Sequence, residues 1–196
     1  MKVARRLLGG VLAVAIAASV AAPASATTLR RASLDELVAG NGTIVVGEVV
    51  GARSYWNAAK NFILTDVRLE VSDVLKGEPK GKEITITILG GRVGDKTTLI
   101  IGGPQLITGN SYVVFLNEED LPGVQGATTV RDLVQGVFDL KIGRDGLRAV
   151  SQANGHPLVP DNLGYIDAAG GAEGMPLVGM MRAIRETAAT QAQEVR

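Results

Sequence analysis

The stretch that decides the fold is "TDVRLEVSDVLKG", residues 65–77, because the spacing of its hydrophobic residues changes partway along. Up to residue 71, β-branched and apolar side chains alternate with charged ones, and the charged ones are Asp66, Arg68 and Glu70. Successive side chains of a strand point to opposite faces, so these three share one face. A charged row opposite an apolar face is typical of the solvated side of a sheet. We prefer this interpretation to a catalytic pair, which would need a shielded carboxylate with a raised pKa.

The alternation ends after residue 71, where Val74 and Leu75 are adjacent and Lys76-Gly77 closes the run. The change predicts a bend at Ser72-Asp73, where a strand covering roughly residues 61–71 leaves the sheet. The run is therefore expected to mark one strand of a core and the turn that follows it.

The neighbouring segments also have β patterns. "TIVVGEVV" at 43–50 is almost wholly apolar, which indicates a buried strand, and Gly47 within it suggests a bulge. "KEITITIL" at 82–89 alternates isoleucine with polar residues, which indicates a half-buried strand. Further strands are expected at 97–103, 111–116, 133–142 and 147–150, and loops at 55–57 and 117–126.

These elements predict a mainly β fold, a small closed or partly open antiparallel barrel with a short N-terminal helix and a C-terminal helix. Ser33 and Glu36 form a capping box at the start of the first helix. Gly47 and Gly136, both expected within strands, favour a barrel because its strands must bend to close. The expected divisions are a barrel domain at 27–150, an irregular Gly/Ala/Pro-rich segment at 151–174, and a helix and tail at 175–196.

The N-terminus has the pattern of a secretory signal peptide over residues 1–26. A basic start with Lys2, Arg5 and Arg6 precedes an uncharged apolar run and the small-x-small sequence Ala24-Ser25-Ala26. An uncleaved anchor is the alternative, but the run is shorter than the ~20 residues that a membrane-spanning helix needs. We therefore expect an exported bacterial protein, periplasmic or secreted, without stable membrane insertion after cleavage.

Composition excludes several classes of function. Without its first 26 residues the chain has 170 residues, with 17 basic and 20 acidic side chains, a net charge of −3. This charge argues against nucleic acid and anionic membranes as partners. The sequence has no cysteine, which excludes disulfides and thiol chemistry. Its one histidine, His156, excludes any metal site that needs two histidines.

The candidate catalytic and metal motifs are incomplete. His156 is the one possible histidine base, but no G-x-S-x-G motif accompanies it. Glu118-Glu119-Asp120 offers the oxygen ligands that calcium prefers but lacks the alternating spacing of a calcium loop. Residues 90–94, "GGRVG", lack the G-K-[ST] ending of a phosphate loop. We therefore expect no catalytic residue, no metal and no cofactor.

The candidate binding residues are Tyr55, Trp56 and Arg92. Tyr55 and Trp56 are adjacent aromatics in a chain that has few. If exposed, they could anchor a partner or a sugar ring; if buried, they would plug one end of a barrel. Arg92 lies in the glycine-rich stretch between two expected strands.

The order of motifs resembles a group of exported bacterial proteins with no assigned activity, and the netrin-like fold of tissue inhibitors of metalloproteinases. The resemblance covers residues 33–140 and implies a barrel of the oligonucleotide/oligosaccharide-binding (OB) type. It does not imply the inhibitors' mechanism, because their zinc-chelating N-terminal cysteine is missing here and cleavage would leave Thr27 first. The similar stretches are "SLDELVAGNGTIVVGEVV", "ILTDVRLEVSDVLKG", "ITITILGG", "GPQLITGNSYVVFL" and "QGVFDL".

The sequence thus predicts a monomeric, non-catalytic binding module whose partner is an envelope or extracellular protein, such as a protease. One alternative is a hydrolase that uses carboxylates or His156 in an unfamiliar geometry. Another is a carbohydrate-binding barrel, which would need exposed aromatic residues on one sheet face.

Overall fold

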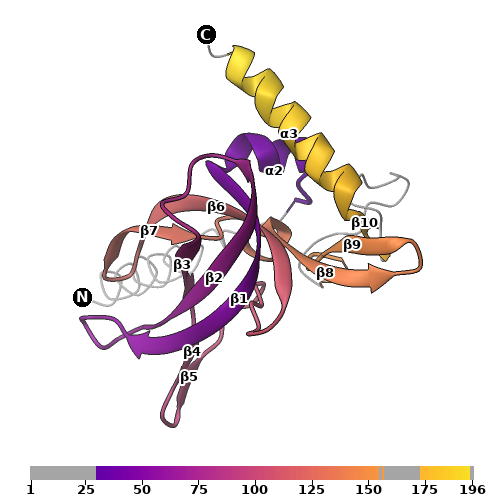
Figure 1. The fold of residues 1–196 in the computed structure, drawn as a ribbon. Helices are drawn as coiled ribbons and strands as arrows, with labels where there is room; N and C mark the ends of the chain where they lie inside the picture. Colours follow the sequence, from indigo (N-terminus) through magenta and orange to yellow (C-terminus); the bar gives the residue numbers. More distant parts are fainter. Residues whose placement is uncertain (1–29, 155, 157–172, 195–196) are drawn as a thin grey trace, which may run out of the picture.

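Two long antiparallel strands, β1 (Thr43–Trp56) and β2 (Ile63–Lys76), form the centre of the computed structural model (Figure 1). The structure describes residues 30–154, 156 and 173–194, so the expected signal peptide and most of the 151–174 segment lie outside the described residues. Within them the protein is mainly β, with one large antiparallel sheet and two helices. This confirms the predicted class and both helices.

The sheet extends from this centre in the order β10-β9-β8-β6-β1-β2-β3, and β7 pairs with the far half of β6. The described strands form an open path with no closed hydrogen-bonded ring. A separate hairpin joins β4 (Gly91–Val93) to β5 (Lys96–Thr98). The other strands are β3 (Glu83–Leu89), β6 (Ser111–Leu121), β7 (Val124–Thr129), β8 (Val137–Gly143), β9 (Gly146–Ser151) and β10 (Met175–Pro176).

The centre of the sheet is buried on both faces. On β1, Val45 and Val49 belong to an inner cluster with residues of β2, β3, β6 and β8. Ile44 and Val46 point to the other face and pack in an outer cluster under the helices α2 (Leu34–Gly40) and α3 (Leu177–Glu194). Burial on both faces explains why this part of β1 is almost wholly apolar.

Two helices cover the outer cluster (Figure 1). The predicted capping box of α2 is confirmed, because Ser33 Oγ accepts from Glu36 N and the Glu36 carboxylate accepts from Ser33 N. α3 buries Met180 and Ile184 on its sheet-facing side. No helix in the described ranges is long and apolar enough to cross a membrane.

The change of spacing in residues 65–77 proves to be a pair of β-bulges rather than the end of a strand. Val46 pairs with Asp73 and Gly47 pairs with Val71, so Ser72 is an extra residue in β2. A second register shift follows at Leu75, and β2 continues to Lys76. Bulges bend a strand without ending it. Glycine is required at Gly47, since a Cβ there would lie 2.5 Å from the Glu70 carbonyl oxygen.

Three expected elements were wrong, for physical reasons that the structure supplies. The strand expected at 97–103 ends at Thr98, before the turn at residues 100–103 in which Gly103 N donates to Ile100 O. The strand expected at 133–142 begins at Val137, because residues 133–136 form a short 3-10 helix, so Gly136 is not within a strand. The acidic loop expected at 117–126 is the hairpin of β6 and β7, in which Glu118 and Asp120 are exposed.

Candidate binding groove

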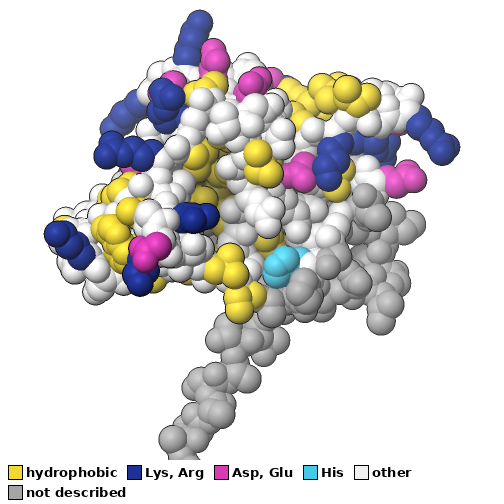
Figure 2. Space-filling model, turned by 90° about the horizontal axis from the view of Figure 1, so that it is seen from below, with side chains coloured by type: hydrophobic (Ala, Val, Ile, Leu, Met, Phe, Trp, Pro, Cys, Tyr) yellow, Lys and Arg dark blue, Asp and Glu magenta, His cyan; other side chains and the backbone are white. Residues whose placement is uncertain are grey.

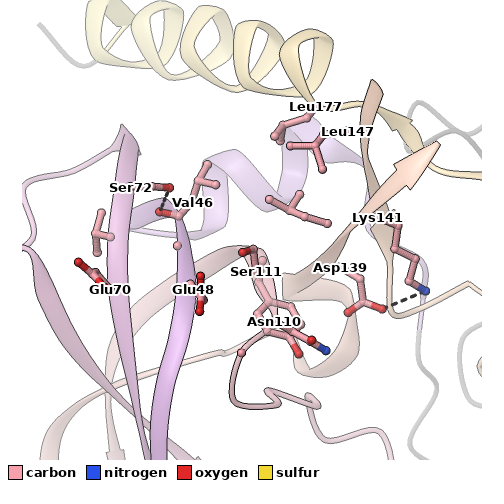
Figure 3. Close-up of a pocket in the computed structure, with 15 residues that line it drawn as sticks. Val46, Glu48, Glu70, Ser72, Asn110, Ser111, Asp139, Lys141, Leu147 and Leu177 are labelled. Carbon is pink, nitrogen blue, oxygen red and sulfur yellow. Dashed lines mark hydrogen bonds and ion pairs between the residues drawn. The ribbon is translucent and has the colours of Figure 1, made fainter. Parts of the chain in front are cut away.

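An open groove of about 710 Å³ lies between the β1–β2 pair and the β8–β9 hairpin, below the first turn of α3 (Figure 3). Its base is the start of β6 at Ser111 and the preceding turn at Gly109-Asn110. β6 pairs with β1 on one side and with β8 on the other. Before β6 begins at Ser111, it does not lie between β1 and β8. The gap between those two strands is the groove.

One wall of the groove carries Glu48 and Glu70, and a third glutamate lies next to them on β3, outside the lining. Glu48 of β1 lies directly opposite Glu70 of β2, and Glu70 lies directly opposite Glu83 of β3. We call these three exposed side chains the acidic row. Arg68 Nη1 lies 3.7 Å from Glu83 Oε2, but the carboxylates of Glu48 and Glu70 have no hydrogen bond or ion pair with any described residue. Like charges directly opposite each other destabilise a sheet, so the acidic row opposes folding.

The carboxylate on the other wall is already paired. Lys141 Nζ lies 3.3 Å from Asp139 Oδ2, and Gln152 Nε2 donates to Asp139 Oδ1 at 2.8 Å. Figure 3 shows Asp139 and Lys141 across the groove from Glu48 and Glu70. The negative charge that is available to a ligand therefore lies on the β1–β2 wall.

The upper edge of the groove is apolar and exposed. Ile142 of β8 lies directly opposite Leu147 of β9, and their exposed fractions are 90 % and 50 %. Leu147 lies next to Leu177 at the start of α3 (Figure 3). Leu147 and Leu177 line the groove, whereas Ile142 lies beside Leu147 just outside the lining. We call Ile142, Leu147 and Leu177 the apolar edge. Exposed aliphatic side chains beside a groove are typical of an interaction surface.

The carboxylates of residues 65–77 have different surroundings in the structure. Burial along β2 follows the predicted alternation, with Val67 and Leu69 buried and Arg68 and Glu70 exposed. Asp66 is half-buried and accepts hydrogen bonds from Tyr55 Oη at 3.1 Å and Thr87 Oγ1 at 2.8 Å. Burial, and then the bond to Asp66, raises the pKa of Tyr55. Asp66 is thus tied into the sheet.

The three predicted binding residues lie away from the groove. Tyr55 and Trp56 belong to the far end of β1 rather than to the expected loop, and Trp56 is 36 % exposed. Arg92 N donates to Ser54 Oγ at 3.3 Å, and Arg92 Nε donates to Gly94 O at 3.1 Å. The structure therefore places Arg92 beside the end of β1 that carries the two aromatics, where its side chain closes the β4–β5 turn.

The candidate catalytic and metal residues are separate from one another. His156 is half-buried, and its backbone N–H donates to Ala153 O at 3.1 Å; its side chain appears in cyan in Figure 2. In the acidic run of β6, Glu119 lies 3.6 Å from Arg131 Nε, and Asp120 accepts from Gly126 N. Among residues 30–154, 156 and 173–194, no three His, Asp or Glu side chains gather closely enough to hold a metal ion.

The groove residues were missed because strand register is not written in local sequence. Glu48 is visible as the single charge in "TIVVGEVV", but the sequence does not indicate that it faces Glu70. Leu147 and Leu177 come together through the pairing of β9 with β10, across a long stretch of chain. A charge within an otherwise apolar strand was the one local sign of this site.

Comparison with known proteins does not indicate what the groove binds. No family model matches the chain, and no curated protein matches it. A function for this chain must therefore be inferred from the geometry of the groove.

Proposed function

We propose that the protein is an exported, non-catalytic binding module that holds a protein ligand of the cell envelope or exterior in the groove. The observation that carries this proposal is that the two walls of the groove differ in chemistry. One wall has the carboxylates of Glu48 and Glu70, and the other has the apolar edge. Both features cost stability in the free protein. Local arrangements that oppose folding are expected where a protein binds its partner.

The strand order supports the proposal that the domain is a partly open barrel of OB or netrin-like type. β1, β2 and β3 form a meander, β6 returns to β1, and β7 pairs with β6 and lies beside β3. A five-stranded, partly open Greek-key barrel has this arrangement. The inner cluster, with Val67, Ile86 and Val114 among its members, would fill such a barrel.

Export is supported by the first 26 residues alone, with their basic start, uncharged apolar run and Ala24-Ser25-Ala26. A chain without cysteine tolerates both reducing and oxidising compartments. Export determines where a ligand must be sought, which is outside the cytoplasm.

Site-specific photo-crosslinking in producing cells tests the proposal. A photoreactive residue replaces Leu147 at the groove or, as a matched control, Leu99, which is 82 % exposed after β5. We expect a discrete protein adduct from position 147 and none from position 99. An adduct from position 99 alone, or turnover of a substrate by the purified protein that Glu48→Gln abolishes, would overturn the proposal.

A further inference from the structure

The β8 strand has an open edge beside the groove. β8 pairs with β9 along its whole length, but it pairs with β6 through residues 137–139 alone. Beyond Asp139, no strand in the described part of the chain pairs with that edge. Unpaired strand edges are templates on which another strand can add.

The pairing pattern shows which backbone groups lie on the open edge. Gln152 N donates to Val137 O at 3.0 Å, so Val137 directs its backbone groups toward β9. Every second residue of a regular strand points the same way, and the β8–β9 pairing has no register shift. Ile142 therefore directs its N–H and C=O away from β9, toward the open edge.

The surroundings of this edge specify the chemistry of an added strand. The exposed side chains of Ile142 and Leu147 offer apolar contact on the β8–β9 side. Across the groove, Glu48 and Glu70 offer two carboxylates that form no ion pair or hydrogen bond with any described residue. Glu48 lies on the same face of β1 as Val46, and Ile142 on the same face of β8 as Phe138, so both features face the side of the outer cluster. Every second side chain of an added strand would face that side, so one segment could present an apolar residue to Ile142 and, two residues along, a basic residue to the acidic row.

We infer that the groove binds an extended, lysine- or arginine-containing segment of the partner protein as a strand added to β8. This inference rests on the proposed function and names the partner's recognition element. Backbone hydrogen bonds to Ile142 give the segment its direction and register. Contacts with the acidic row, charge-assisted and stronger than neutral ones, select its basic side chain.

Synthetic peptides test the inference with the protein purified from the cells that export it. The probe is an end-capped octapeptide that repeats Thr-Lys-Thr-Val twice, so that lysine and valine share one face of the strand, and its binding is followed by fluorescence anisotropy. Two matched peptides replace every lysine by glutamate or methylate alternate backbone nitrogens. We expect the lysine peptide to bind and both matched peptides to bind at least about tenfold more weakly. Hydrogen exchange at the Ile142 amide should slow when the lysine peptide is bound.

Variants of the protein distinguish recognition by the Glu48 and Glu70 carboxylates from attraction by the net charge of the protein. The double variant Glu48→Gln, Glu70→Gln should weaken binding of the lysine peptide about tenfold and flatten its dependence on salt. Its control is Glu118→Gln, Glu119→Gln in the β6–β7 hairpin, which changes the net charge equally and should leave binding unchanged. Circular dichroism and the thermal midpoint verify that both variants are folded.

The outcomes distinguish failure of this inference from failure of the proposed function. If no lysine peptide binds at about 1 mM while position 147 still crosslinks in cells, strand addition is wrong and the binding groove stands. Equal binding of the methylated peptide, or of the glutamate peptide, likewise overturns the inference alone. If position 147 gives no crosslink and no peptide binds, both proposals fail.

Discussion

The carboxylates at the two ends of the charged face of β2 have opposite surroundings. Asp66 accepts hydrogen bonds from Tyr55 and Thr87 and is half-buried. Glu70, on the same face of the same strand, lies between Glu48 and Glu83. The difference indicates that hydrogen bonding at the Asp66 end serves the fold, whereas the open charges at the Glu70 end are available to a ligand.

The Asp66 end is closed further by a second set of hydrogen bonds. Ser54 Oγ and Thr65 Oγ1 lie 2.8 Å apart, and Thr65 Oγ1 donates to Gly90 O at 2.7 Å. This network fixes the start of the β4–β5 hairpin against β1 and β2. At the Glu70 end, by contrast, the neighbouring space is the groove. Each prediction below changes one side of this comparison.

Substitution of Gly91 should have the largest effect, because it breaks the closed end. Gly91 has φ +132°, and a Cβ there would lie 2.5 Å from Ser54 Oγ and still closer to Thr65 Oγ1. We expect Gly91→Ala to lower the free energy of unfolding by about 3 kcal/mol through backbone strain and overpacking. The matched control, Gly94→Ala, has φ +61° with no atom near its Cβ, and should cost about 1 kcal/mol. Equal losses in urea unfolding would contradict this account.

Removal of the Asp66 carboxylate should have the next largest effect. Asp66→Ala deprives Tyr55 Oη and Thr87 Oγ1 of a charged acceptor, and we expect a loss of about 2 kcal/mol. Tyr55→Phe removes one of the two bonds and should cost about 1 kcal/mol. Chemical denaturation of the two variants and of their combination measures the coupling. Strictly additive losses would mean that Tyr55 and Asp66 stabilise the sheet independently.

The features that could be predicted from the sequence are those that depend on the spacing of nearby residues. The capping box of Ser33 and Glu36 and the alternation along β2 are both present in the structure. The strand "KEITITIL" was placed within one residue of β3. In each of these cases a few consecutive residues determine the outcome through backbone geometry and burial.

What could not be predicted depends on register and on long-range contact. "TTLIIGG" has the composition of a strand, yet Leu99 and Ile101 are exposed in the irregular segment after β5, because no strand pairs with them among the described residues. The groove depends on the alignment of Glu48 with Glu70, which the turn after β1 and one register shift at Val50 set together. A sequence pattern gives the face of a side chain but not the neighbour across the strand.

Replacement of Glu70 by lysine should reverse the unfavourable charge pattern at the open end. Glu70→Lys places a cation between Glu48 and Glu83, so we expect stability to rise by about 0.5 kcal/mol. The same variant should no longer bind the lysine peptide, because the new cation occupies the position that the peptide's own lysine would take. Glu118→Lys is the control, since Glu118 lies opposite Thr128 and has no like charge across the strand. If both variants change the thermal midpoint equally, the acidic row is not a local source of strain.

The smallest effect is expected from Glu36, a paired carboxylate like Asp66 but at the surface. Hydrogen bonds from the Arg30 guanidinium, at 2.8 and 3.1 Å, and then from the Ser33 N–H lower the pKa of Glu36 to about 2. Because this pKa is lower in the folded state than its ordinary value of 4.5, the carboxylate stabilises the fold above pH 4.5. That contribution should disappear as the pH falls toward 2, so the thermal midpoints of the protein and of Glu36→Gln should converge there. Arg30→Gln should raise the pKa of Glu36 toward 4.5 in an NMR titration, and an unchanged titration midpoint would show that Arg30 is not the cause.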